Sequence, residues 1–402
     1  MFEPLKGVRV IDLSQVLAGP YATYLLALMG AEVIKIEKPG EGDWTRKGPG
    51  VPQLSAEGMG VGYLTQNAQK KSVALDLKSD EGCEALRRLC KTADVFLENF
   101  KPGVAGRLGF DFEAVQQLSP SVVYCSVSAF GQDGPLSKRP AYDHIIQGMC
   151  GIMKTTGAIG AGPQKVGAPY VDYATGMNAA MAVLAGIIAA RQTGKAQHLD
   201  VAMLDTSLMM MASLMTMHLN TGWIPSQSGN EAWSQSPSSG AFETSDGLLM
   251  LAANNEKQLR AMCSAIGRED ILTDERWNTP KKFRENAADL RETLVKTFLT
   301  RTAAEWEDLL NNVAVPAGKV RGLEDVLAEE QVKDRGLIRE VGCGDGQPGL
   351  QLPSLGFKAN GVAPSPNQAP PKLGQHTAEV LTEIGYSHQE MTNLTDGTEA
   401  SV

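Results

Sequence analysis

One aspartate, Asp172, stands where a carboxylate could act as a nucleophile. It lies in the segment 167–176 (GAPYVDYATG), at the start of a long apolar run that predicts a helix. An aspartate at this point is commonly an N-cap, because its carboxylate accepts hydrogen bonds from the first free amides. A helix N-terminus also stabilises an anion and supplies amide donors for an oxyanion. The residues alone therefore leave two compatible roles open, structural cap and covalent nucleophile.

Other kinds of catalytic centre lack their sequence patterns. The six cysteines form no C-x-x-C pair and the five histidines have no ligand spacing, which argues against a metal. We interpret the cysteines as reduced and mostly buried thiols. The glycine cluster at 160–162 lacks the third glycine of a dinucleotide-binding loop, and there is no Walker sequence or G-x-S-x-G elbow. A net charge of −9 argues against general nucleic-acid binding.

The elements that would position Asp172 alternate between strands and helices. Buried or alternating apolar runs predict four strands, and longer amphipathic runs between them predict helices. The predicted strands are 8–14, 31–37, 94–98 and 121–128, and the predicted helices are 19–29, 79–91 and 112–118. Strand, helix and strand in this order build parallel sheets, so we expect a doubly wound, Rossmann-like α/β large domain.

Two apolar helices are predicted next. Residues 172–191 are small and apolar nearly all round, which predicts a helix buried on most of its faces. Residues 201–219 carry closely spaced methionines that we interpret as core filler. No window reaches the ~18 uninterrupted apolar residues of a membrane span, and the N-terminus lacks the pattern of a secretory signal. We therefore expect a cytoplasmic protein that does not enter a membrane.

Composition changes mark the domain boundaries. A long Gly-, Ser-, Pro- and Gln-rich loop follows residue 220, and the strand and helix patterns beyond it predict a smaller α+β unit. A proline-rich linker at 364–371 precedes a last predicted helix at 378–385. We expect a large domain over 1–220, a small domain over 221–325, and a linker and C-terminal part over 326–402.

Many ordered segments together resemble the family III CoA-transferases, the group that contains formyl-CoA and carnitine CoA-transferases. The matching segments are VRVIDLSQVLAGPYAT, GAEVIKIEKPGEGDWTR, LDLK, ENFKPGVAGRLGF, YDHIIQGMCG, GAPYVDYATG, RQTGKAQHLDVAMLD, VPAGKV and PPKLGQHTAEVL. The resemblance runs over nearly the whole chain. It implies a large domain built from both chain ends and two ring-like subunits interlocked as a homodimer.

The resemblance also implies the site residues. Asp172 would be the nucleophile, and the cofactor-binding residues would be Leu17, Ala18, Lys38, Leu75, Lys78, Asn99, Phe100, Lys101, Arg107, Tyr142 and Asp143. The cations among them would supply the local positive charge that CoA phosphates require in an acidic chain. No tightly bound cofactor is expected, because the CoA thioester is itself the substrate. The partners would be an acyl-CoA, with succinyl-CoA as the expected donor, and a short dicarboxylic acid.

The sequence departs from the formyl-CoA enzymes at two places. Pro140 stands where they have a lysine before the Tyr142–Asp143 pair, and Lys138 or Arg139 could replace it. The segment 234–240 (SQSPSSG) stands where they have a glycine-rich loop that covers the active site. Formyl-CoA and oxalate are therefore weaker candidates for the substrates.

Two alternatives remain open at this stage. The superfamily contains α-methylacyl-CoA racemases, which move a proton with a His/Asp pair. Here Tyr142 occupies the position of their histidine, and we interpret His144 as a packed helix residue. A non-catalytic CoA-binding subunit is the other alternative, against which the intact motif around Asp172 counts.

Overall fold

The computed structural model describes residues 2–232, 234–343 and 349–391, which fall into two compact units. The large unit comprises Met1–Ile152, Lys165–Trp223 and Glu330–Val402, and the small unit comprises Met153–Gln164 and Ile224–Glu329. The segment 153–164 groups with the small unit although it precedes the long loop in sequence. The reason is local, since Gln227 Nε2 donates hydrogen bonds to the carbonyls of Thr156 (2.7 Å) and Gly162 (3.1 Å).

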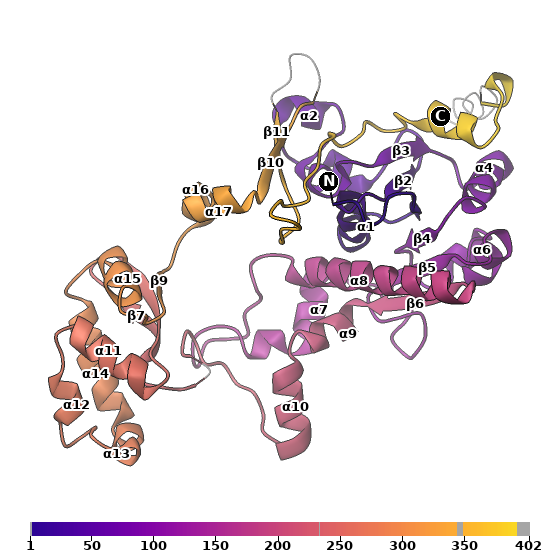
Figure 1. Cartoon of the computed structure of the whole chain (residues 1–402). Coiled ribbons are helices and arrows are strands. Elements are labelled where there is room, and N and C mark those ends of the chain that lie inside the picture. Colours follow the sequence, from indigo (N-terminus) through magenta and orange to yellow (C-terminus); the bar gives the residue numbers. More distant parts are fainter. Residues whose placement is uncertain (1, 233, 344–348, 392–402) are drawn as a thin grey trace. The chain divides into compact units, whose positions relative to one another are not determined.

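A six-stranded sheet forms the centre of the large unit, and all of its strand pairs are parallel (Figure 1). Its strands are β1 (Arg9–Asp12), β2 (Glu32–Glu37), β3 (Lys71–Ala74), β4 (Val95–Glu98), β5 (Val123–Ser128) and β6 (Gln197–Ala202). Their order is β3-β2-β1-β4-β5-β6. The strand order reverses between β1 and β4, which is the switch point of a doubly wound sheet. The predicted α/β class with a parallel sheet is confirmed.

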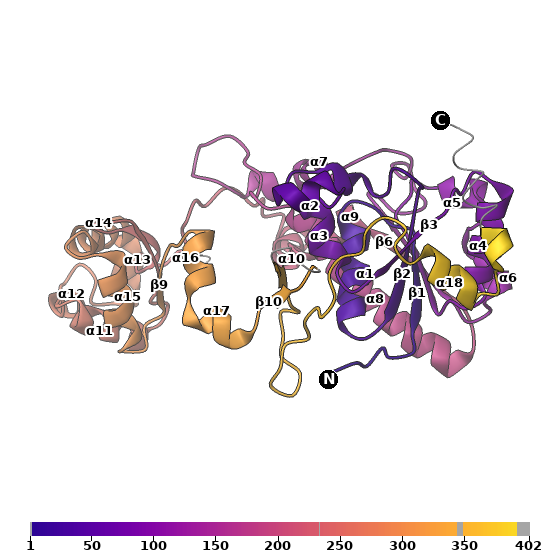
Figure 2. The same cartoon turned by 90° about the horizontal axis from the view of Figure 1, so that it is seen from above.

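Helices cover both faces of this sheet. Val10 and Ile11 are neighbours on β1 but enter different buried clusters, because successive residues of a strand point to opposite faces. The helices α1 (Ala18–Leu28) and α8 (Tyr170–Thr193) pack on the face of Val10. The helices α4 (Asp80–Cys90), α6 (Phe112–Leu118) and α18 (Thr377–Glu383) pack on the face of Ile11 (Figure 2).

The large unit also contains elements outside this sheet and the helices that cover it. They are η1 (Trp44–Lys47), α2 (Pro52–Ala56), α3 (Val61–Asn67), α5 (Val104–Arg107), α7 (Asp143–Cys150), α9 (Met203–Met209), α10 (Ala212–Thr221), α17 (Glu330–Arg335) and an antiparallel pair of β10 (Ile338–Val341) with β11 (Leu350–Pro353). A short turn η2 (Ile152–Lys154) lies at the border of the two units.

The small unit combines a short antiparallel sheet with helices. Its strands are β7 (Ser239–Glu243), β8 (Leu248–Ala252) and β9 (Ala317–Lys319), and its helices are α11 (Glu256–Ala265), α12 (Asp270–Thr273), α13 (Pro280–Glu285), α14 (Ala287–Phe298), α15 (Ala303–Asn311) and α16 (Leu323–Ala328). Inside its core the ring of Phe298 contacts the rings of both Phe242 and Trp306.

The interpretation of residues 201–219 as one helix with core methionines is wrong. The chain forms the end of β6 and then two helices, α9 and α10. Met203 is buried, but the exposed fractions of Met209 and Met217 are 64% and 43%. Helix α10 has no buried residue, because it leaves the sheet instead of packing on it. These apolar side chains therefore belong to the surface of the single chain.

Helix α8 is only partly buried, unlike the helix expected there. Met177, Met181 and Ile188 are exposed and lie on one face, since residues four and seven positions apart share a face. Among the helices in the described ranges, α8 is the one that is long and apolar enough to cross a membrane. The polar residues Asp172 and Asn178 interrupt the apolar sequence of this helix, so a search for uninterrupted apolar runs does not find it. The opposite face packs against α1 and the sheet, as in the core helix of an α/β protein.

Candidate functional site

A cavity of about 250 Å³ opens at the carboxyl ends of β1, β4 and β5. Its walls come from the loops that follow these strands, from the segment before α7 and from the start of α8. They are formed by Val16–Ala18, Asn99–Pro102, Val127–Ala129, Ser137, Arg139–Tyr142, Asp172 and Met203. Because β1 and β4 flank the switch point, this is where a doubly wound sheet binds ligands.

The cavity collects most of the residues that the resemblance implied. Asp172 lines it together with Leu17, Ala18, Asn99, Phe100, Lys101 and Tyr142. These residues come from four separate stretches of the chain, so only the fold brings them together. Lys38, Leu75, Lys78, Arg107 and Asp143 do not line this cavity.

The loop between β1 and α1 forms one wall in a strained conformation. Val16 has a φ of +74°, which a β-branched residue rarely adopts and which needs support from its surroundings. The carboxylate of Asp43 supplies it by accepting a hydrogen bond from the N–H of Val16 (3.2 Å). The side chain of Asn99 binds both the N–H (2.9 Å) and the carbonyl (2.8 Å) of Gln15. Asn99 thus holds the loop as well as lining the cavity.

A buried ion pair supports this loop from the interior of the large unit. Lys35 Nζ lies 3.1 Å from Asp43 Oδ2 and donates to the carbonyl of Ser14 (2.6 Å), and all these side chains are buried. Burial works against charge on Asp43, but Lys35 and the hydrogen bonds of Thr45 keep its pKa below the usual value. Breaking a buried pair by removing one partner leaves an unpaired charge in the interior, so the network fixes the geometry of the loop.

Helix α1 begins at the cavity, with Leu17 before its first residue, Ala18. The backbone N–H groups of Ala18 and Gly19 donate to no residue that the structure describes. Free amides at the start of a helix are suited to bind an anion or a developing oxyanion. The amides at the start of α8 have partners, so Ala18, which lines the cavity, provides a free donor on its wall.

The start of α8 is capped by a residue from another helix. Asp172 is the third residue of α8 and makes no capping hydrogen bond. Instead, Asp143 Oδ2 accepts hydrogen bonds from the N–H groups of Val171 (2.8 Å) and Asp172 (3.2 Å). Asp143 Oδ1 accepts from Gln147 Nε2 (2.6 Å). The N-cap role considered for Asp172 is therefore wrong, and its carboxylate accepts no hydrogen bond from the described residues.

Asp172 has an unusual ionisation. Burial raises the pKa of its carboxyl to about 7, and the nearby carboxylate of Asp143 adds to the shift. Both effects oppose a negative charge on Asp172. A carboxylate that is poorly solvated and free of hydrogen bonds is more nucleophilic than one in water, and strongly shifted pKa values are typical of functional sites.

Gly176 lets the two helices of the site approach each other. It lies one turn after Asp172 on α8, and a Cβ atom at this position would stand 2.7 Å from the carbonyl oxygen of Ala18. Only glycine tolerates such an approach between α8 and the beginning of α1. The final glycine of the GAPYVDYATG segment thus sets the separation between Asp172 and the free amides of α1.

Two cations line the cavity, Lys101 and Arg139. Neither forms an ion pair with any residue of the described ranges. Arg139 lies next to Pro140, where the formyl-CoA enzymes have a lysine, whereas Lys138 does not line the cavity. Of the two candidates to replace the missing lysine, Arg139 is thus the one that lines the cavity. The sequence alone did not distinguish Lys138 from Arg139 as the replacement for this lysine, because neighbouring residues in a loop have no periodicity that shows which side chain faces the site.

The other residues expected to contact CoA lie outside this cavity. Lys38 and Leu75 directly follow the carboxyl ends of β2 and β3. Leu75 is buried beside Pro39 in a separate hollow of about 360 Å³. Lys38 is exposed and forms an ion pair with Glu41, whose pKa is lowered first by Lys38 and further by Lys47 and Lys78. Lys78 and Arg107 are exposed. The cations after β2 and β3 thus gather around one carboxylate, outside the cavity of Asp172.

His144 is exposed and does not line the cavity, so its interpretation as a packed helix residue is wrong. It stacks on Tyr142, with ring centroids 6.5 Å apart. Within the described residues, no group of three or more His, Cys, Asp or Glu could hold a metal ion. The cysteines are free thiols, four of them buried, as predicted.

Comparison with known proteins identifies the family of the chain. The model of CoA-transferase family III matches residues 5–377. The chain is 38% identical to the succinate–glutarate CoA-transferase of Agrobacterium fabrum, over 95% of this chain and 96% of that protein. It is 34% identical to the succinyl-CoA:glutarate CoA-transferase of Mus musculus, over 95% and 86% of the two chains. Its structure is similar to that of a CAIB/BAIF family protein from Brucella suis, with a TM-score of 0.84, 32% identity and coverage of 96% and 100%.

Proposed function

Because the chain belongs to CoA-transferase family III, we propose that it moves CoA from succinyl-CoA to a short dicarboxylate such as glutarate, with Asp172 as the covalent nucleophile. The class of reaction, CoA transfer between an acyl-CoA and a carboxylate, follows from the family. The observation that carries the role of Asp172 is its carboxylate, which lines the switch-point cavity without a hydrogen-bond partner among the described residues. A carboxylate in this state is available to attack.

The first half of the reaction would transfer CoA to the enzyme. The carboxylate of Asp172 attacks the thioester carbonyl, the C–S bond breaks, and CoA leaves as a thiolate, which gives a mixed anhydride. The thiolate then attacks the side-chain carbonyl of Asp172. This releases the donor acid as a carboxylate and leaves an aspartyl-CoA thioester. No water enters, so the activation of the thioester is retained.

The second half would repeat these steps with the acceptor acid. Its carboxylate attacks the aspartyl thioester, which forms a second anhydride and frees the thiolate again. The thiolate attacks the acceptor carbonyl, and the new acyl-CoA leaves with Asp172 restored as a carboxylate. CoA must stay bound while its thiolate waits, and a fixed position raises the effective concentration of the thiolate.

Residues around the cavity would assist these steps. The free N–H groups at the start of α1 are suited to stabilise the oxyanion that forms at each carbonyl. Lys101 and Arg139 offer unpaired positive charge for a CoA phosphate or for the second carboxylate of a dicarboxylic acid. Water must be kept out, because it would hydrolyse the anhydrides. The glutarate specificity is supported by the names of the two relatives, both of which act on glutarate.

We further propose that the protein is a homodimer. The exposed apolar face of α8, with Met177 and Met181, and the exposed Met209 and Met217 leave a large apolar surface on the single chain. Surfaces of this kind mark protein–protein contacts. A second copy of the chain is the partner that the family resemblance implies, with the two subunits interlocked.

The test of the proposed function is a product assay with succinyl-CoA and a panel of acids. The panel would contain glutarate, other dicarboxylates, oxalate and monocarboxylates. The acyl-CoA products would be separated and identified by mass spectrometry. We expect glutaryl-CoA and free succinate in equal amounts. Hydrolysis of succinyl-CoA without a new acyl-CoA, or exchange of an α-proton without transfer, would contradict the proposal.

A further inference from the structure

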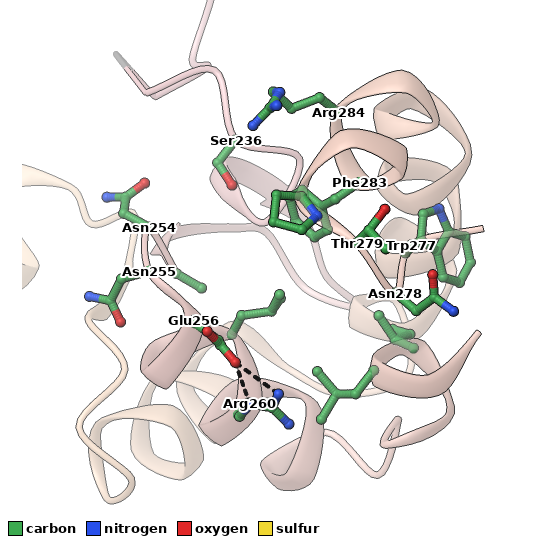
Figure 3. A pocket seen from close by; sticks show the side chains of 15 residues that line it. Ser236, Asn254, Asn255, Glu256, Arg260, Trp277, Asn278, Thr279, Phe283 and Arg284 are labelled. Atoms are coloured by element: carbon green, nitrogen blue, oxygen red, sulfur yellow. Dashed lines mark hydrogen bonds and ion pairs between the residues drawn. The ribbon is translucent and has the colours of Figure 1, made fainter. Parts of the chain in front are cut away.

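A second cavity, of about 380 Å³, lies entirely within the small unit. It is enclosed by the start of α11, by α12, by α13 and by Ser236. In Figure 3, Arg284 and Ser236 lie at one end of the hollow and the ion pair of Glu256 with Arg260 lies at the other. The volume falls within the range of small-molecule pockets. None of its lining residues lines the cavity of Asp172.

The floor of this cavity is apolar. Ile271 and Trp277 line it and belong to the buried core of the small unit, while Leu259 and Phe283 pack against that core and remain partly exposed. The floor is therefore backed by a packed core. An apolar surface of this kind favours a ligand with a hydrocarbon body, because burying the body removes it from water.

The rim carries an uncompensated positive charge. Arg260 is neutralised by Glu256, with 2.8 Å between Arg260 Nη2 and Glu256 Oε1. Arg284 forms no ion pair with any described residue. Its helix α13 carries two more cations, Lys281 and Lys282, against one acid, Glu285. A ligand at the Arg284 end of the cavity would thus meet a positive field.

One uncharged group of the rim, the side chain of Asn254, offers a free hydrogen-bond donor. Asn254 Oδ1 already accepts hydrogen bonds from the hydroxyls of Ser234 (2.6 Å) and Ser239 (2.8 Å), which leaves its Nδ2 amide without a described partner. Asn255 is occupied by Gln258, through both its oxygen and its amide. A free guanidinium, with a further amide donor on the same rim, matches a carboxylate, which only accepts hydrogen bonds.

We propose that the small unit binds an organic monocarboxylate with an apolar body, which places its carboxylate at Arg284 and its hydrocarbon on Leu259, Ile271 and Phe283. The site shares no lining residue with the cavity of Asp172, and the proposal does not depend on the proposed function. Since Asn254 also holds the segment 234–240 through Ser234 and Ser239, an occupant that takes the amide of Asn254 would steady this segment.

The test uses octanoate as the probe on the full chain, with isothermal titration calorimetry and hydrogen–deuterium exchange. We expect saturable binding of one octanoate per chain and slower exchange in peptides that cover 253–260 and 277–285. Octan-1-ol, which has the same chain length but no charge, should bind less tightly by about tenfold or more. Glutarate, which has no apolar body, should not slow exchange in these peptides.

Variants separate this site from the catalytic one. Arg284→Gln should weaken octanoate binding by about tenfold or more, because a charge-assisted hydrogen bond is lost. Lys282→Gln removes the same charge from the same helix outside the cavity and should change binding little, as should Asp172→Asn in the large unit. Arg284 and Lys282 are both exposed, so the fold should persist in both variants, which circular dichroism checks. The proposal is overturned if octanoate fails to saturate at millimolar concentration, if Arg284→Gln binds like the parent, or if Asp172→Asn abolishes binding.

Discussion

The carboxylate of Asp143 holds the backbone N–H of Asp172 at 3.2 Å, so one aspartate fixes the position of the other while its charge opposes ionisation of that neighbour. Asp143 thereby does two things at once. It replaces the missing cap of α8, and it helps to keep the pKa of Asp172 near neutrality. The two aspartates are 29 residues apart in sequence and meet only because α7 packs against the start of α8.

Replacing Asp143 by asparagine should lower the pKa of Asp172. The oxygen of the amide can still accept from the α8 backbone, but the negative charge that opposes ionisation is gone. The pH–rate profile of kcat/KM should therefore shift its rising limb to lower pH. Because the new amide group would face the donating Nε2 of Gln147, some loss of stability, about 1–3 kcal/mol, is also expected. A rising limb that stays in place or moves to higher pH would rule out this role of Asp143.

Replacing Asp172 by asparagine should change how stability depends on pH. The folded pKa of Asp172 is about 7 and its ordinary value is 3.8, so between these values the folded state binds more protons than the unfolded state. Stability from this group is present at low pH and falls as pH rises through that window. Asp172→Asn should remove this loss and unfold at a higher temperature above neutral pH.

Thermal unfolding of the parent and the variant, at about pH 5 and about pH 8, tests the sign. The difference between the two proteins isolates Asp172, because other titrating groups such as Glu98 are common to both. An advantage of the variant that is equal at the two pH values, or larger at the lower one, would mean that Asp172 ionises normally.

Arg139 should matter for substrate binding and Lys138 should not. Arg139 lines the cavity without an ion pair, so Arg139→Gln removes a charge-assisted contact and should raise KM for succinyl-CoA or the acid by about tenfold or more. Lys138→Gln makes the same change one residue earlier, outside the cavity, and serves as the matched control. Steady-state kinetics with each substrate varied in turn would distinguish them. Equal effects of the two substitutions would show that the charge acts only at long range.

A methyl group at Gly176 should disturb the site through the packing of α1. Gly176→Ala would place a Cβ 2.7 Å from the carbonyl oxygen of Ala18 and push the free amides away from Asp172. Gly186→Ala is a matched control further along the same helix, where the new Cβ meets the side chain of Val123 at 2.7 Å. Overpacking should destabilise both variants by about 1–3 kcal/mol. Only Gly176→Ala should also lower kcat, by about tenfold or more, since small misplacements at a reacting centre are costly.

The predicted elements were the ones with a strong periodic signal. Buried runs such as VRVIDLS and DVFLE predicted β1 and β4, and the amphipathic segment at 79–91 predicted α4. Strand β3 is short and begins with a lysine, and β6 (QHLDVA) is polar along half its length. Neither strand was therefore predicted from the sequence. Burial was misjudged where apolar side chains face outward, as on α8 and α10, because sequence alone does not tell a core from an uncovered surface.

The site was predictable in part for a similar reason. The segments that resemble the family predicted Asp172, Asn99 and Lys101 as site residues, and these three do line one cavity. The supporting contacts lacked a local signal. Asp43 reaches Val16 from 27 residues away, and Asp143 caps a helix in place of a residue that looked like its own cap. Such contacts depend on the assembled sheet and helices.

The most direct test of the central claim is mass spectrometry of the protein after rapid quenching with succinyl-CoA, followed by peptide mapping of the region around Asp172. We predict a CoA or succinyl adduct on Asp172, which disappears when glutarate is added and is absent in Asp172→Asn. Glutaryl-CoA formed by Asp172→Asn at the rate of the parent, or an adduct on another residue, would contradict the role of Asp172 as the covalent nucleophile.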